Sequence, residues 1–377
     1  MDKSVDPCQD FFNYACGNWN KTHPIPAQYP RWGRFNELQD RNREVLPQIL
    51  EDSAKNQSRS AVDQKLGAFY QSCMDEEAIE KAGYAPIEPG LARISRLKDK
   101  ADMVRDVTWL HNQGVTAFFQ FGAPPDLDKS TVHSANLEQG GLGLPDKSDY
   151  LGGKDEAIRS KYVAHASRML QLVGTPRADA NRQASAMMQL ETALAKSSLD
   201  RVAMRDPNNT RHRMTVAQFQ ALTPDFDYSS YFADRATPHF DSLNVEEPDF
   251  FRDLNTALKS TTLEDLKSYL VWHYVSSKAD LLSNAFVSEN FEFYGRTLTG
   301  SQELTPRWQR CTSSVDRNLG EALGQKYAEK AFGSEAKQKT KQLAEAIEKQ
   351  MAVDIDSLTW MSNATKEQAL AKLRGSY

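Results

Sequence analysis

Apolar residues that recur at helical spacing constrain the fold of this chain most strongly. Leu38, Val45 and Ile49 share one stripe among acidic and basic residues, which is typical of an amphipathic helix beginning near Arg34. The same spacing recurs over 62–73, 87–97, 103–113, 158–172, 187–194, 266–281, 316–331, 335–354 and 366–373. We therefore expect a mainly α fold, a large multi-helical lobe, for this chain.

Strand-like sequence is confined to residues 115–138. A β-branched and aromatic run at 115–121 is followed by Pro124 and Pro125, and then by an alternating polar run at 130–137. This pattern predicts one small β-hairpin or meander. The glycine-rich segment 140–146 lacks the spacing of a dinucleotide-binding loop, and we expect a plain turn there.

Size and charge narrow the class of protein. A chain of 377 residues predicts either one large helical lobe with sub-domains or two domains. Its 46 basic and 51 acidic residues give a net charge of −5 without a basic block, so nucleic acid is not an expected partner. Its apolar runs are far shorter than the roughly 18–20 residues that a membrane span requires, so we expect no membrane span in this chain.

The histidines do not form the pattern of a catalytic zinc site. Such a site uses zinc ligands one helical turn apart. None of the seven histidines lies four residues from another, and the H-E-x-x-H motif is absent. His165 and His273 fall in apolar helical stripes, where packing is the expected role. A G-x-S-x-G nucleophile motif is also absent. We therefore expect no catalytic residue and no bound metal in this chain.

The cysteines and one arginine leave alternatives open. Four cysteines are too scattered for a metal knuckle, and they are either buried thiols or cross-links of an oxidising compartment.

Arg31 lies among aromatic residues in the segment 29–35. Its guanidinium suits a carboxylate ligand; the alternative is a surface arginine that stacks on Trp32.

Several segments in order carry a family resemblance. The chain resembles the neprilysin-like zinc metallopeptidases, a family that includes neprilysin, endothelin-converting enzyme and bacterial oligopeptidase O. The likeness runs through Cys8–Trp19, Ile25–Pro26, Arg31–Phe35, Phe69–Asp75, Gly143–Tyr150, Arg205–Pro207, Arg307–Cys311 and Leu358–Met361. In that family these segments form the front part of a protein about twice as long.

The resemblance implies a function for the longer parent. A full-length parent would be a two-lobed zinc metalloendopeptidase that cleaves peptides before hydrophobic residues, with its zinc ligands beyond Tyr377. This chain would supply the non-catalytic lobe that restricts access by size, and the catalytic lobe of the same polypeptide would be its partner. Residues 1–35 would be an extended segment packed on that catalytic lobe, 36–377 the helical lobe, and 355–377 the linker. An extracytoplasmic location, periplasmic, secreted or as a membrane-anchored ectodomain, is also implied.

The resemblance further assigns individual residues. Arg31 matches an arginine that holds the carboxylate or backbone of a bound peptide, and Phe35 matches an aromatic residue that lines the pocket for the hydrophobic residue after the cut. Cys73 and Cys311 match a disulfide. Cys8 and Cys16 match cysteines whose partners lie in the catalytic lobe, so in this chain both are expected to be unpaired, or bonded to each other or to another molecule.

Two alternatives remain open at this stage. The chain could be a peptide- or protein-binding helical module without catalysis. It could also be a helical scaffold of unrelated origin, which a large distance between Cys73 and Cys311 would indicate.

Overall fold

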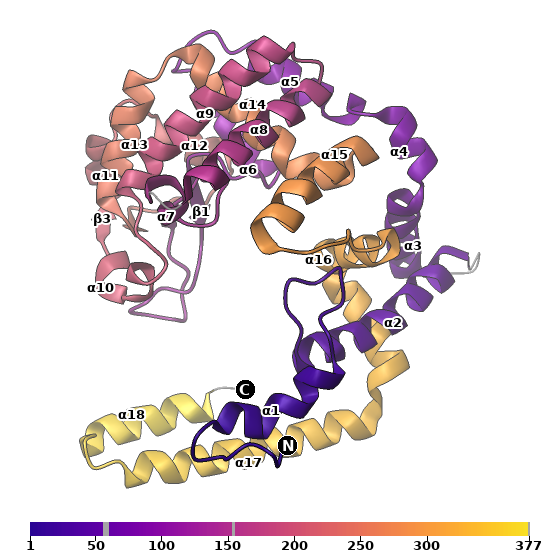
Figure 1. Cartoon of the computed structure of the whole chain (residues 1–377). Helices are drawn as coiled ribbons and strands as arrows, with labels where there is room; N and C mark the ends of the chain where they lie inside the picture. The colour runs from indigo at the N-terminus through magenta and orange to yellow at the C-terminus, as the bar shows by residue number, and fades with distance from the viewer. Residues whose placement is uncertain (56–59, 153–154, 376–377) are drawn as a thin grey trace. The chain divides into compact units, whose positions relative to one another are not determined.

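The computed structural model describes residues 1–55, 60–152 and 155–375 (Figure 1). The chain forms two compact units. Unit 1 comprises Met1–Arg31 and Glu76–Leu304, and unit 2 comprises Trp32–Asp75 and Thr305–Tyr377. This division differs from the expected boundary at residue 35, because two segments distant in sequence share one core in unit 2.

Unit 1 is mainly helical. Its α-helices are α1 (Phe11–Thr22), α4 (Glu76–Ala82), α5 (Glu88–Ser95), α6 (Met103–Asn112), α7 (Lys147–Leu151), α8 (Glu156–Leu172), α9 (Arg177–Ser197), α10 (Pro207–Thr210), α11 (Val216–Leu222), α12 (Tyr228–Asp234), α13 (Pro248–Ser260), α14 (Leu263–Lys278) and α15 (Asn284–Asn290). The short 3₁₀-helices are η1 (Ala85–Ile87), η3 (Ala203–Arg205) and η4 (Ala279–Leu281), and η5 (Phe291–Thr299) is a π-helix. The long helices α8, α9 and α14 pack on one another, and the expectation of a mainly α fold is confirmed.

One small sheet accompanies these helices. The expected hairpin is confirmed, because β1 (Phe119–Gly122) pairs antiparallel with β2 (Asn136–Gln139). Two strands that the sequence analysis did not expect, β3 (Arg213–Thr215) and β4 (Ser242–Val245), complete the order β1-β2-β4-β3. Strand β4 lies parallel to β2 and antiparallel to β3.

Strand β1 begins later than the aromatic run from residue 115 suggests. Phe118 has a φ of 62°, a left-handed conformation that a bulky residue rarely adopts. Its backbone N–H donates to the hydroxyl of Tyr269, which in turn donates to the carbonyl of Gly141, at 2.9 Å in each case. This contact with α14 holds the chain out of strand geometry until Phe119.

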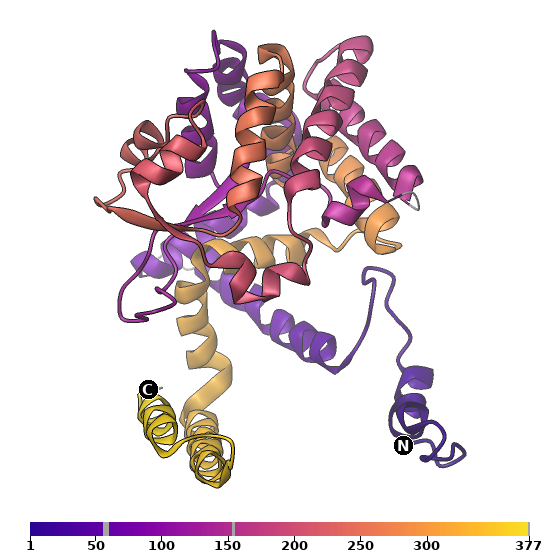
Figure 2. The ribbon, with the colours of Figure 1, turned by 90° about the vertical axis from the view of Figure 1, so that its left-hand side faces the viewer.

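Unit 2 contains a second core, around which α2 (Arg34–Lys55), α3 (Ala61–Met74) and α16 (Arg307–Tyr327) pack. The π-helix η6 (Ala328–Phe332) connects α16 to α17 (Gly333–Ser357), and α18 (Asn363–Arg374) follows. The buried side chains of this core come from α2, α3 and α16 and are Ile49, Leu50, Leu66, Tyr70, Cys311, Val315 and Leu323. In Figures 1 and 2, α17 and α18, in yellow, lie side by side as a helical hairpin.

One segment that was expected to be extended is partly helical in the structure. The N-terminal segment was predicted to be extended, but it contains α1, because Asp10 caps the helix by accepting a 3.0 Å hydrogen bond from the backbone N–H of Asn13. In the predicted linker 355–377, α18 agrees with the helical spacing expected over 366–373, and Ser362 caps this helix by accepting from the N–H of Thr365. Within the described part of the chain, no helix is both long and apolar enough to cross a bilayer.

Candidate functional site

Arg31 follows a loop whose position is fixed within unit 1. The carbonyl of Ala27 accepts hydrogen bonds from the backbone N–H groups of Gln302 and Glu303, at 2.7 and 3.1 Å. The N–H of Tyr29 closes a turn on the carbonyl of Pro26 at 2.9 Å. The side chain of Arg31 is exposed. A cation at the end of an anchored loop is therefore accessible to an anionic ligand.

Phe35 lies in the first turn of α2 in unit 2. Its side chain is 87 % exposed, and Leu38, three residues further along the helix, is 53 % exposed. The buried residues of α2 are confined to its second half, so packing does not account for an aromatic side chain at Phe35. Ion pairs from Glu37 to Arg34 at 2.8 Å and to Arg41 at 3.7 Å bracket this apolar surface.

The structure places the two predicted peptide-binding residues in different units. Arg31 is the last residue of the first segment of unit 1, and Phe35 belongs to unit 2. Each is exposed on its own unit. Their roles in binding a peptide stay predictions.

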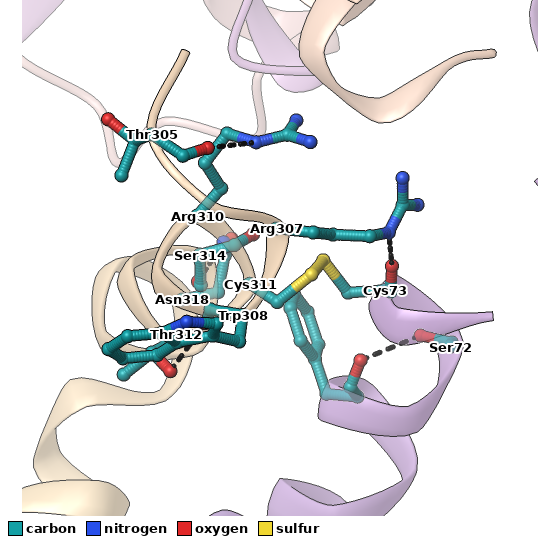
Figure 3. The surroundings of a disulfide bond; sticks show 11 residues. Ser72, Cys73, Thr305, Arg307, Trp308, Arg310, Cys311, Thr312, Ser314 and Asn318 are labelled. Carbon is teal, nitrogen blue, oxygen red and sulfur yellow. Dashed lines mark hydrogen bonds between the residues drawn. A yellow bond between two sulfur atoms is a disulfide. The ribbon is translucent and has the colours of Figure 1, made fainter. Parts of the chain in front are cut away.

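Cys73 and Cys311 form a disulfide within unit 2 (Figure 3). Their Cα atoms are 5.6 Å apart although 238 positions separate them in sequence, so the predicted pairing is confirmed and its geometry is ordinary. The guanidinium of Arg307 donates to the carbonyl of Cys73 at 2.9 Å (Figure 3). The bond ties the end of α3 to the start of α16, and closing a loop of this length stabilises the fold by about 5 kcal/mol in the chain-entropy model.

Cys8 and Cys16 carry free, exposed thiols in the structure. Cys8 lies before α1, where its backbone N–H donates to Asp6 at 2.9 Å, and Cys16 lies within α1. Exposed thiols of this kind are available for oxidation or for bonding to another segment.

The two histidines predicted to pack in the core are buried, as expected. His165 is fully buried and stacks on Phe293 with ring centroids 5.0 Å apart, while its Nδ1 lies 2.9 Å from Glu289. Burial lowers the pKa of His165. The Nε2 of His273 lies 3.0 Å from Glu191. Both imidazoles therefore serve hydrogen-bonding networks of unit 1.

Glu191 is the centre of a buried network that the sequence analysis missed. Its carboxylate is fully buried in α9 and accepts hydrogen bonds from Tyr150 at 2.5 Å and from Tyr162 at 3.1 Å. His273 contacts the same carboxylate, and the backbone N–H of Gly143 donates to it at 3.2 Å. The pKa values of Tyr150 and Tyr162 lie far above the usual value for tyrosine, mainly because both hydroxyls are buried. The only sequence signal was an acidic residue inside an apolar helical stripe.

This network explains the glycine-rich segment 140–146, which is a turn, as predicted. The hydroxyl of Tyr150 accepts hydrogen bonds from the N–H groups of Gly143 and Leu144, at 3.0 and 2.8 Å. A Cβ added at Gly143 would lie 1.8 Å from the hydroxyl of Tyr162, so only glycine fits there. The network thus fixes the turn against α8 and α9 and is structural.

The donor set of the described residues does not fit a zinc ion. Among residues 1–55, 60–152 and 155–375, no three histidine, cysteine, aspartate or glutamate side chains gather in a way that could hold a metal ion. His165 and His273 are each committed to a glutamate.

Comparisons with known proteins identify the family. The profile of peptidase family M13 matches residues 7–375. The chain belongs to peptidase family M13, and the resemblance to neprilysin-like zinc metallopeptidases is confirmed.

Sequence relatives include endothelin-converting enzyme 1 of Rattus norvegicus, which is 28 % identical over 391 residues, covering 100 % of this chain and 51 % of the relative. Neprilysin-3 of Drosophila melanogaster is 28 % identical over 396 residues, covering 99 % of this chain and 50 % of the relative. The chain thus spans about half the length of these curated relatives.

Solved structures with a similar fold include two bacterial proteins. The inhibitor complex of zinc metalloprotease Zmp1 of Mycobacterium tuberculosis has a TM-score of 0.90 and 31 % identity, over 99 % of this chain and 57 % of that chain. PepO of Lactobacillus rhamnosis HN001 has a TM-score of 0.84 at 18 % identity, covering 98 % of this chain and 59 % of that chain, a likeness in fold alone.

Proposed function

We propose that this chain is the non-catalytic lobe of a zinc-dependent metalloendopeptidase that cleaves peptides before hydrophobic residues. Membership of peptidase family M13 supports this proposal. The chain also spans only about half the length of its relatives, as one lobe of a two-lobed protein would. Zinc and the residues that bind it would belong to the part of the parent that corresponds to the other half of those relatives. This chain would bind the peptide and restrict access by size.

The exposed side chain of Phe35 is the observation that carries the peptide-binding role. An aromatic side chain that is 87 % exposed beside a half-exposed Leu38 gives α2 an apolar surface without a packing function. Burial of a hydrophobic peptide side chain against it would contribute about 1.5–3 kcal/mol. Arg31 would supply a guanidinium for the carboxylate or backbone of a bound peptide.

The partner of this chain would be the catalytic lobe, and α17 offers a surface for it. Leu343, Ile347 and Met351 recur every four residues on α17 and are 62, 59 and 51 % exposed. Residues four apart lie on one face of a helix. An exposed apolar stripe of this kind marks a contact surface, and the catalytic lobe is the occupant that the family implies.

An extracytoplasmic location belongs to the same proposal. The disulfide between Cys73 and Cys311 supports it, because such bonds persist in oxidising compartments.

Peptide binding to the 377-residue chain tests the proposal. A labelled peptide with one phenylalanine should bind, and Phe35→Ala should weaken binding about tenfold or more. Arg31→Gln should weaken binding of a peptide with a free carboxylate. Phe12→Ala is a matched control, because Phe12 is also exposed, at 63 %, but lies on α1.

If the unsubstituted 377-residue chain and its Phe35→Ala and Phe12→Ala variants bind the peptide with equal affinity, the result would contradict a peptide-binding role for α2. A second assay uses the full-length parent with bound zinc. Peptide cleavage that a chelator abolishes is expected, whereas peptide binding without cleavage would favour a binding module.

A further inference from the structure

A cavity of unit 2 lies between α2 and α16. Its volume is about 560 Å³, and its lining includes Gln39 and Arg43 of α2 together with Asp316, Arg317 and Tyr327 of α16. All of these residues belong to unit 2. The cavity is therefore a feature of one compact unit.

A kink interrupts α16 between Arg317 and Leu323, which both line this cavity. In α16, Leu319 has non-helical angles, φ −133° and ψ 28°, which kink the helix just before Gly320. In α2, Pro47 lies inside the helix, where it lacks the N–H that would bond to the preceding turn. Both helices line the cavity. The hydroxyl of Tyr327 bridges them by donating to Asn42 at 2.9 Å.

The charges on the cavity wall favour an anionic ligand. Arg43 and Arg317 contribute guanidinium groups from opposite helices, and Asp316 contributes one carboxylate. The side chain of Arg43 is 22 % exposed and forms an ion pair with Asp40 at 3.5 Å. A planar guanidinium binds a carboxylate in two places. A carboxylate is therefore the group that this wall would recognise.

The position of the cavity on α2 connects it with Phe35. Phe35, Gln39 and Arg43 are spaced four residues apart and lie along one face of α2. At 1.5 Å per residue, Arg43 lies about 12 Å from Phe35 along the helix. An extended peptide rises about 3.4 Å per residue, so it crosses this distance in three or four residues.

We propose that this cavity is a carboxylate-binding subsite, which selects peptides with a carboxylate three or four residues after the hydrophobic residue that contacts Phe35. The inference rests on the proposed peptide-binding function and adds a substrate preference to it. The carboxylate is either an acidic side chain or the C-terminus of the peptide.

Three labelled peptides and fluorescence anisotropy on the 377-residue chain test this subsite. Each peptide carries one phenylalanine and three glycines, followed by amidated glutamate, amidated glutamine, or glutamine with a free carboxylate. A charge-assisted contact contributes about 1.5–3 kcal/mol, so one or both charged peptides should bind at least about tenfold tighter than the neutral peptide. The charged peptide that gains affinity identifies the source of the carboxylate.

Variants then assign the preference to the cavity. Arg43→Gln and Arg317→Gln should each remove the preference while leaving the affinity for the neutral peptide unchanged. Arg41→Gln is the matched control, an identical change at an exposed residue of α2 that pairs with Glu37 at 3.7 Å. Arg317 is exposed, so its variant remains informative if Arg43→Gln unfolds.

The outcomes separate the two proposals. Equal affinity for all three peptides, lost in Phe35→Ala, would overturn the subsite and leave the proposed function intact. A preference that Arg41→Gln removes as effectively as Arg43→Gln would also overturn the subsite. Absence of binding by every peptide would overturn the proposed function, and the subsite with it.

Discussion

The hydroxyl of Tyr150 donates a 2.5 Å hydrogen bond to the carboxylate of Glu191, which is fully buried in α9. The same carboxylate contacts Tyr162 and His273, so it joins α7, α8, α9 and α14. A buried carboxylate is stable only with such partners. The contact therefore holds unit 1 together around the turn at Gly143.

Replacement of Glu191 tests this structural role. Glu191→Gln keeps the shape but removes the charge and one acceptor oxygen, so we expect the free energy of unfolding to fall by about 1–3 kcal/mol. Urea denaturation followed by circular dichroism measures this change. Glu303→Gln is the control, because Glu303 is exposed in the same unit. Equal stabilities of the two variants would contradict the role of the network.

Glu247 predicts a pH dependence of stability in unit 1. It is 4 % exposed, and burial raises its pKa from a usual value of 4.5 to about 7. At pH values between 4.5 and about 7, Glu247 is ionised in the unfolded chain but still protonated in the folded chain. Its contribution to stability therefore falls as the pH rises from 4.5 to about 7. Glu247→Gln should therefore stabilise the protein at pH 8, by up to about 3 kcal/mol, and have little effect near pH 4.5. Urea denaturation at both pH values checks this; a larger effect of the substitution at the lower pH would contradict the burial argument.

The disulfide makes a separate prediction for unit 2. The double variant Cys73→Ser and Cys311→Ser should lose about 2–5 kcal/mol of stability, because the bond closes a very long loop. Guanidinium denaturation under non-reducing conditions measures the loss. In Cys8→Ser with Cys16→Ser, stability should change by less than about 0.5 kcal/mol, since both residues are exposed. Equal losses in the two double variants would refute this account of the disulfide.

Phe35 should separate binding from stability. Because its side chain is 87 % exposed, Phe35→Ala should change the free energy of unfolding by less than about 0.5 kcal/mol, although it weakens peptide binding. Thermal unfolding of the variant checks the first part. A large loss of stability would show that Phe35 packs within the fold and is not a free binding surface.

The apolar stripe on α17 predicts association with the catalytic lobe. Leu343→Gln, Ile347→Gln and Met351→Gln together should leave the helical content unchanged but weaken binding to a separately produced catalytic lobe, as surface plasmon resonance would measure. Equivalent changes at exposed polar positions of α17, Gln342→Ala and Lys349→Ala, serve as the control. Unchanged affinity in the stripe variant would contradict this role.

The long helices of the fold could be predicted from sequence, because several turns of amphipathic spacing give a clear period. The boundaries expected near Arg34 and Met103 agree with α2 and α6. Strands β3 and β4 could not be predicted, since three and four residues are too short to show alternation. Helix α1 was missed because the prolines and glycine around it suggested irregular chain, whereas the cap at Asp10 outweighed them.

The candidate site was predictable only in part. The pairing of Cys73 with Cys311 came from the family resemblance, because no local pattern links residues 238 positions apart. The Glu191 network and the cavity at Arg43 depend on side chains from separate helices. Such convergence is a property of the packed structure and leaves no periodic signal in the sequence.

The most direct measurement is mass spectrometry of a phenylalanine-containing peptide incubated with the 377-residue chain and added zinc. The account predicts that the chain binds the peptide and that the peptide is recovered intact. Cleavage on the amino side of phenylalanine that a chelator abolishes would contradict the central claim, because the catalytic zinc site would then lie within this chain.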